Sequence, residues 1–374
     1  MTHKHLNFVW DNFGPIHIDR IEAVARAYPS VQVTGLEIHG RSQTYAWNSE
    51  SAPRCNKVTL FPQSNSRGLA LLRALIRHRI QCGRAIWFLC HYDWKEILLF
   101  AFFLRLLGDQ VFTMADSKFD DYQRNLWREL GKKFFLLPYK GALGASARSR
   151  DYLRFLGIKP ETIVKGYDTL STIRIRALAG QPPAPNGTPF SKRHFSIVAR
   201  LVPKKNLFVA LKAYSLYAAQ TSDPRPLHLC GNGPLEAELR AYADELRISA
   251  LVVFHGFIQT DAVARLLGST LALILPSTEE QFGQVVPEAL AMGLPIILSD
   301  NCGARDELVR TGVNGFVVES DNAEGMASFM ILLATDEALW RRMCIATARF
   351  MPHGDVTEFT KGVAKLAGIN ATYS

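Results

Sequence analysis

Two glutamates, Glu280 and Glu288, lie eight positions apart in the stretch EEQFGQVVPEALAMGLPII (279–297). A carboxylate in the first turn of an expected helix, as at Glu288, can accept hydrogen bonds from a pair of sugar hydroxyls. Arg200 and Lys205 follow an earlier apolar run. A guanidinium can clamp phosphate oxygens with two hydrogen bonds and an ammonium adds a point charge, so this pair suits a diphosphate.

Glycine and aromatic residues follow similar apolar runs. Phe282 and Gly283 precede the expected helix that carries Glu288, and Gly256 and Phe257 follow the run LVVF. Glycine lets a backbone approach a ligand closely, and a helix N-terminus favours phosphate oxygens. Together with the charged residues, these positions indicate a ligand that carries both phosphates and sugar hydroxyls.

The elements that would position these residues are short apolar strands alternating with helix-length segments. In the second half the expected strands are FSIVA (195–199), LHLC (227–230), LVVF (251–254), LALILP (271–276), PIILS (295–299) and GFVV (315–318). Near-continuous apolar strands separated by helices are typical of a parallel sheet covered on both faces.

The first half repeats this alternation less regularly. Its expected strands are LNFVW (6–10), VQVT (31–34), AIWFLC (85–90) and QVFTM (110–114), with helices near 18–27, 66–79, 93–107 and 119–130. We therefore predict an α/β protein with two Rossmann-like domains.

The stretch AGQPPAPNGTP (179–189) holds four prolines and two glycines, which is typical of a linker. The predicted domains are 1–178 and 190–354, and the final helix, 355–374, could join the first domain. Ligands of such sheets bind at the carboxyl ends of the strands.

The composition limits the class of protein. Of 374 residues, 48% are hydrophobic and 21% are charged, which is ordinary for a globular enzyme. The six cysteines form no C-x-x-C pair and no His cluster accompanies them, so we expect neither a metal site nor disulfides, and a reducing cytoplasm fits. No apolar run reaches the roughly 18 residues of a membrane span, and the N-terminus lacks a signal-peptide pattern.

The net charge of +9 is unevenly distributed. Residues 1–170 contain 24 Lys and Arg against 15 Asp and Glu, whereas the remainder contains 19 of each. A basic first half suits an anionic partner such as lipid headgroups or a phosphorylated acceptor, although solubility alone is the other interpretation. We find no nucleic-acid-binding motif and expect no nucleic acid. The apolar stretch 94–107 is either a buried crossover helix or a helix that dips into a membrane surface.

The second half resembles the retaining nucleotide-sugar glycosyltransferases of family 4, which have the GT-B fold of two Rossmann-like domains facing a central cleft. The motifs that carry the resemblance are, in order, ARLVPKKN (199–206), LCGNGPL (229–235), FHGF (254–257), EQFGQVVPEALAMGLP (280–295) and GARDELVRTGVNGF (303–316). The resemblance implies transfer of a sugar from a nucleoside diphosphate sugar to a hydroxyl acceptor, with retention of the anomeric configuration.

The resemblance also implies roles for the catalytic residues. Arg200 and Lys205 would neutralise the donor diphosphate, and Glu280 would bind the hydroxyls of the transferred sugar. With these cations, the family's chemistry needs no metal and no cofactor other than the donor.

The remaining positions of the second half would bind the donor. Phe282 and Gly283 would offer backbone N–H groups near the sugar and phosphate. Glu288 would bind the ribose, and the backbone around Gly256 and Phe257 would receive the base.

In the first half the match is thinner. Gly14 fits a glycine loop that approaches the donor phosphates. Many members place a histidine near the sugar where this chain has Ala115. We expect His17, His91 or Asp116 to take over that contact with the acceptor or the sugar.

The acceptor remains open at this point between a glycan, a glycolipid and a small hydroxyl compound. The basic first domain favours an envelope or polysaccharide pathway, with the enzyme cytoplasmic or peripheral at the inner membrane face. A nucleotide-sugar epimerase of the same architecture and a catalytically silent relative are the alternatives.

Overall fold

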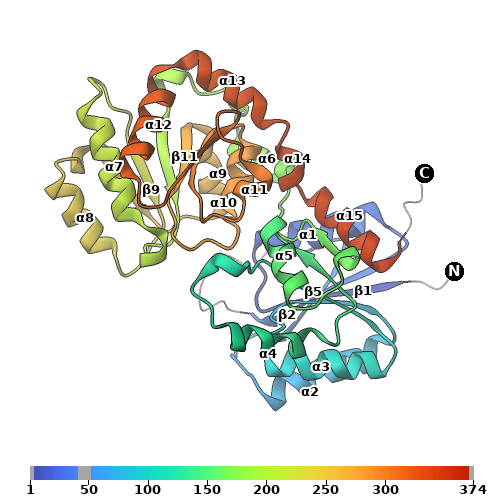
Figure 1. Ribbon diagram of the computed structural model, residues 1–374. Helices are drawn as coiled ribbons and strands as arrows, with labels where there is room; N and C mark the ends of the chain where they lie inside the picture. The colour runs from blue at the N-terminus through green and yellow to red at the C-terminus, as the bar shows by residue number, and fades with distance from the viewer. Residues whose placement is uncertain (1–3, 41–51, 370–374) are drawn as a thin grey trace. The chain divides into compact units, whose positions relative to one another are not determined.

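The chain forms two compact units. The computed structural model describes residues 4–40 and 52–369. One unit consists of Met1–Ser171 together with Val356–Ser374, and the other of Thr172–Asp355 (Figure 1).

The first unit contains a parallel sheet in the order β3-β2-β1-β4-β5-β6-β7. Its strands are β1 (His5–Trp10), β2 (Gln32–His39), β3 (Asn56–Phe61), β4 (Ile86–Leu89), β5 (Gln110–Ala115), β6 (Gly141–Gly144) and β7 (Ile163–Lys165). The central strands β1, β4 and β5 are apolar and buried almost throughout, as expected for a sheet covered on both faces.

Helices cover both faces of this sheet. The first face carries α2 (Leu69–Cys82), α3 (Lys95–Leu106), α4 (Leu126–Leu136) and α5 (Ala147–Phe155), which share one core with Val9, Trp87 and Val111. On the other face α1 (Pro15–Ala27) packs against α15 (Val356–Ala367), and the rings of Phe359 and Phe8 are 5.7 Å apart. The segment after residue 355 thus completes the core of the first unit.

The second unit contains a parallel sheet in the order β10-β9-β8-β11-β12-β13. Its strands are β8 (His194–Val198), β9 (Leu227–Cys230), β10 (Val252–Gly256), β11 (Thr270–Leu275), β12 (Ile296–Ser299) and β13 (Gly315–Val318). Its helices are α6 (Thr172–Ala179), α7 (Leu207–Ala219), α8 (Glu236–Glu245), α9 (Thr260–Gly268), α10 (Val285–Ala291), α11 (Arg305–Leu308), α12 (Ala323–Thr335), α13 (Glu337–Thr347) and α14 (Met351–Gly354).

The predicted α/β fold with two parallel sheets is confirmed. The six strands expected in the second half are all present, but β3, β6 and β7 were not among those predicted for the first. The Pro-rich stretch 179–189 lies inside the second unit, where Ala184 is buried and its N–H donates to Met292 O at 2.9 Å.

One predicted helix is wrong in its position. Residues 119–130 do not form a continuous helix, because a short 3₁₀ turn, η1 (Phe119–Asp121), is followed by a break before α4. Asn125 caps α4, and its side chain accepts hydrogen bonds from the N–H groups of Trp127 and Arg128.

Within the described ranges, no helix combines the length and the apolar character that crossing a bilayer requires. The apolar stretch 94–107 forms α3, which buries Ile97, Phe100 and Leu104 and leaves Leu106 exposed. It is therefore a crossover helix with one solvent-facing apolar side.

Candidate active site

The ammonium of Lys205 contacts the carboxylate of Glu280 in an ion pair. Lys205 ends the 3₁₀ turn η4 (Pro203–Lys205) after β8, and Glu280 follows the neighbouring strand β11. Ser277 Oγ donates a hydrogen bond of 3.1 Å to the same carboxylate. Both charged side chains keep 13% of their surface exposed, so they remain accessible to a ligand.

Asn206 holds the Lys205 turn against its surroundings. It has the left-handed φ of +55°, which asparagine tolerates better than most residues. Its amide donates to Pro276 O at 3.1 Å and to Ser320 O at 2.6 Å, linking the turn to the segments after β11 and β13. Sequence reasoning assigned no role to Asn206, although its place at the end of PKKN was a usable signal.

The loop that begins at Glu280 is held by close backbone packing against the segment of Gly303 and Ala304. Gly303 N donates to Glu280 O at 3.1 Å, and Ala304 N donates to Phe282 O at 2.9 Å. A Cβ atom on Gly303 would lie 1.8 Å from Gln281 O, so this position requires glycine. Gly283 adopts a φ of +101° inside the same loop, a conformation that favours glycine, and a Cβ atom there would lie 3.4 Å from Glu280 Cγ.

The GNG turn after β9 lets the segment of Arg200 pack closely. A Cβ on Gly231 would lie 1.8 Å from Ala199 O, and one on Gly233 would lie 2.4 Å from Leu201 O. Arg200 itself is partly buried at the end of β8. The two glycines thus have a packing role beside a predicted phosphate-binding residue.

The other predicted donor-binding residues lie at the same edge of the second sheet. Gly256 ends β10 with a φ of +66°, and an added Cβ there would meet no atom within 4 Å. Phe257 is 36% exposed, whereas Phe282 is buried. Glu288 lies partly buried in the first turn of α10. The predicted donor-binding residues therefore follow the carboxyl ends of β8, β10 and β11, at one edge of the sheet.

In the first unit, Gly14 and His17 form a local cap. Gly14 N–H donates to His17 Nδ1 at 2.9 Å at the start of α1. The imidazole lies 5.0 Å from the ring of Trp10 and is stacked on Phe13. Burial, and then the positive charge of Arg20, hold the pKa of His17 well below its usual value. His17 is therefore neutral, and Nδ1 is its acceptor nitrogen.

His91 and Asp116 follow the adjacent strands β4 and β5. His91 has a φ of +57° and stacks on Trp94 at 4.3 Å, and burial lowers its pKa. Asp116 is partly buried. Burial, reinforced by the charge of Asp168, raises the pKa of Asp116 to about 7. A carboxyl group with such a pKa can hold or accept a proton near neutral pH.

Sequence reasoning missed the charged pair behind Asp116. Arg20 of α1 forms a buried ion pair of 3.2 Å with Asp168, which follows β7. Tyr167 Oη accepts a hydrogen bond of 3.0 Å from Trp10 Nε1. An acidic residue after a strand was a signal for Asp168, but the strand itself was not predicted.

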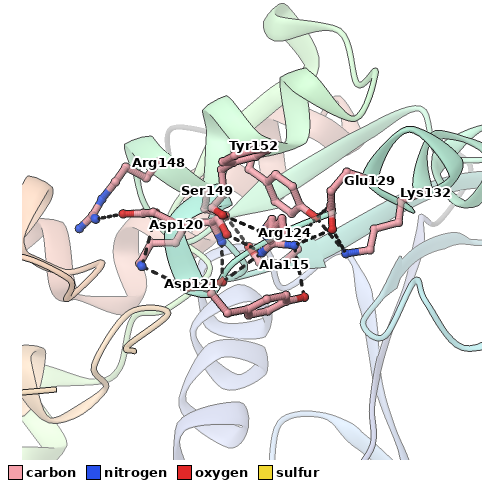
Figure 2. Close-up of polar contacts among 12 residues, drawn as sticks. Ala115, Asp120, Asp121, Arg124, Glu129, Lys132, Arg148, Ser149 and Tyr152 are labelled. Atoms are coloured by element: carbon pink, nitrogen blue, oxygen red, sulfur yellow. Dashed lines mark hydrogen bonds and ion pairs between the residues drawn. The ribbon is translucent and has the colours of Figure 1, made fainter. Parts of the chain in front are cut away.

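A polar network holds the loop that follows Asp116 (Figure 2). Arg124 donates to Tyr152 Oη at 2.8 Å and to Glu129 at 3.2 Å. Ser149 Oγ donates to Ala115 O at 3.0 Å, which links the end of β5 to α5. Side-chain hydrogen bonds within the first unit thus hold both the end of β5 at Ala115 and the loop that follows it.

Across residues 4–40 and 52–369, no group of three or more His, Cys, Asp or Glu side chains is arranged to hold a metal ion.

Part of the chain matches a known protein family. Residues 183–350 match the family described as "Glycosyl transferases group 1". The matched residues lie inside the second unit, and the ion pair and the glycine-rich turns lie among them.

Two curated relatives match part of the chain. A poly(glycerol-phosphate) alpha-glucosyltransferase of Bacillus subtilis (strain 168) is 31% identical over 157 residues, 42% of this chain and 23% of that protein. The amylovoran biosynthesis glycosyltransferase AmsK of Erwinia amylovora is 30% identical over 147 residues, 38% of this chain and 36% of that protein. The chain thus spans well under half the length of these relatives.

A solved structure matches the fold over nearly the whole chain. The Anabaena protein HepE, in complex with UDP and glucose, has a TM-score of 0.73 at 15% identity, and the match covers 98% of this chain and 100% of that one. The α/β architecture with two parallel sheets is that of GT-B glycosyltransferases.

Proposed function

We propose that this protein transfers a hexose-type sugar from a nucleoside diphosphate sugar to a hydroxyl acceptor with retention of configuration. The contact between Lys205 and Glu280, inside a group 1 glycosyltransferase domain, carries the proposal. This observation supports the proposal because an ammonium suits phosphate, a carboxylate suits sugar hydroxyls, and both lie at one sheet edge.

In the proposed reaction, the bond from the anomeric carbon to the diphosphate oxygen breaks and a bond to the acceptor oxygen forms. Arg200 and Lys205 stabilise the charge that develops on the leaving diphosphate. Glu280 orients the transferred sugar, and Glu288 binds the ribose. The departing phosphate takes the acceptor proton on the same face of the sugar, so neither a metal nor a further cofactor enters the scheme.

The donor is proposed to rest on Phe282, Gly283, Gly256 and Phe257, with Gly14 near its phosphates. UDP and glucose are bound by HepE, which supports UDP-glucose as a first probe.

The acceptor is proposed to be a glycan, a glycolipid or a small hydroxyl compound. His17, His91 and Asp116 are the first-unit residues proposed to contact it or the transferred sugar. The name of the Erwinia amylovora relative, amylovoran biosynthesis, supports a polysaccharide pathway. The cytoplasm is proposed as the place where the enzyme acts.

The test is a panel of nucleotide sugars, UDP-glucose included, read by ligand-induced melting shifts without acceptor. We expect one donor to raise the melting temperature of the wild type and Glu288→Ala to reduce that shift. Glu324→Ala, which removes an exposed glutamate of α12, is the matched control and should keep the full shift.

Product analysis separates the alternatives. Transfer with retention gives an α-linked product from an α-configured donor, visible in the anomeric proton coupling. Isomerised donor without acceptor-dependent product would instead identify an epimerase, and no shift with any donor would identify a silent relative.

A further inference from the structure

Helix α4 exposes its apolar side chains and buries its acidic one. Trp127 is 82% exposed and Phe134 is 69% exposed, whereas Glu129 is only 2% exposed. A surface helix ordinarily turns its apolar stripe toward the core. The outward side of α4 thus has the character of an interior or an interface.

Polar contacts fix α4 in this orientation. Glu129 accepts hydrogen bonds from Lys132 at 2.8 Å, from Arg124 at 3.2 Å and from Tyr152 (Figure 2). Arg124 precedes the helix and Tyr152 belongs to α5, so the contacts anchor α4 from two sides. Turning Trp127 inward would break these contacts and leave a buried carboxylate unpaired, which is costly.

The apolar exposure continues over the neighbouring helices on this face of the sheet. Of the seventeen large apolar side chains that are exposed among the described residues, twelve lie between positions 69 and 137. On α2, α3, α4 and the residues that directly follow them, these are Leu69, Ile80, Leu99, Phe102, Leu106, Leu107, Leu126, Trp127, Phe134 and Leu137. We call the exposed side chains of these three helices the α2–α4 face; the helices are labelled together in Figure 1.

The exposed charges of the α2–α4 face are all positive. They are Arg73, Arg77, Lys95, Arg105, Arg128 and Lys133. The two acidic residues of these helices are both paired, Glu96 with Arg67 at 3.5 Å and Glu129 with Lys132. This face therefore combines aromatic and aliphatic groups with cations and offers no exposed acid.

We propose that the α2–α4 face docks on the surface of an anionic phospholipid bilayer. Tryptophan, phenylalanine and leucine suit the boundary between headgroups and acyl chains, and arginine and lysine attract anionic lipids. A second copy of this chain would bring one basic face against another, which like charge opposes. The inference goes beyond the proposed function, since it uses the first unit alone and needs no donor.

The test is co-sedimentation of the whole protein with phosphatidylcholine vesicles that contain or lack phosphatidylglycerol. We expect binding to the anionic vesicles at low salt, and weaker binding as salt screens the cations. The double variant Trp127→Ser, Phe134→Ser should lower the partition coefficient by about tenfold or more. Arg128→Glu with Lys133→Glu should lower it by a similar factor.

Ile345→Ser is the matched control, because Ile345 is 65% exposed on α13 of the second unit. It should bind vesicles as the wild type does. All variants change exposed side chains, and melting temperatures close to that of the wild type confirm that they fold.

Three outcomes would overturn the proposal: no binding to anionic vesicles, equal loss with Ile345→Ser, or a vesicle-free dimer that Trp127→Ser, Phe134→Ser dissociates. The last would identify the face as a self-association surface. Donor-induced melting shifts are measured without lipid, so failure of docking and failure of the glycosyltransferase proposal are separate results.

Discussion

Lys205 and Glu280 are 75 positions apart in the chain and form an ion pair at the carboxyl ends of two adjacent strands. The pair is partly buried and is supported by Ser277 on one side and by the packed turn of Asn206 on the other. Each partner therefore neutralises the charge of the other. A diphosphate that bound Lys205 would compete with Glu280 for the same ammonium group.

The first prediction concerns the energy of this pair. Lys205→Met leaves the Glu280 carboxylate partly buried without its cation, so we expect the free energy of unfolding to fall by about 1–2 kcal/mol. Chemical denaturation measures this loss. Adding Glu280→Gln to the same protein should restore part of it, because the unpaired charge is then removed.

The Glu280→Gln change alone should separate donor binding from sugar transfer. Glu280→Gln keeps the shape of the side chain and should lower the rate of sugar transfer by about a hundredfold. Donor-induced melting shifts should persist in this variant. If the variant turns over as fast as the wild type, Glu280 has no role in sugar transfer.

The second prediction concerns the glycine that crosses the Glu280 loop. Gly303→Ala would bring Cβ to 1.8 Å from Gln281 O, so the backbone must move. We expect a loss of about 2–4 kcal/mol in the free energy of unfolding and a displaced Glu280. Gly131→Ala is the control: Gly131 lies in α4 with open space around it, and alanine should stabilise that helix by up to about 1 kcal/mol.

The third prediction concerns the pH dependence of Asp116. Its pKa is about 7 in the folded protein and ordinarily 3.8. Between these values the folded protein keeps a proton that the unfolded chain has released, so the free energy of unfolding falls as the pH rises, by at most about 1.4 kcal/mol per pH unit. Asp116→Asn should remove this slope in urea titrations run from pH 4 to pH 8.

Asp120 provides the opposite case in the same loop. Although desolvation opposes the effect, Lys118 and Arg148 lower the pKa of Asp120. Its stabilising contribution is therefore present above pH 3.8 and is lost as the pH falls through the lowered value. Asp120→Asn should lower the free energy of unfolding at neutral pH. It should leave unchanged the pH dependence that Asp116 gives to that free energy. If both variants show the same pH profile, the assignment to Asp116 is wrong.

Much of the second unit could be predicted because its signals are local. Most strands are apolar runs that end at a glycine or a charged residue, and the expected roles of Arg200, Lys205 and Glu288 come from short motifs. A short motif does not show which backbone segment will pack against it in the folded protein. The need for glycine at position 303 comes from the carbonyl of Gln281, which only the folded chain brings within reach.

The first unit was harder to predict for physical reasons. Strand β6 is only GALG, too short and too rich in glycine to show a period. Arg20 looks like a surface residue of a helix, and its burial depends on Asp168, 148 positions away. In α4 the usual pattern of buried apolar and exposed charged residues is reversed. Glu129 is buried because it pairs with Arg124, Lys132 and Tyr152, and Trp127 is left exposed.

Helix α15 gives the two units different histories during synthesis. The second unit is one continuous stretch, Thr172–Asp355, and has all its strands once that stretch has left the ribosome. The first unit is translated earlier but lacks Phe359 and the rest of α15 until synthesis has passed residue 367. Domains usually mature in the order in which they are made. The nascent chain therefore holds a first sheet with all of its strands but without α15 on the Phe8 face, while the second unit is already able to fold.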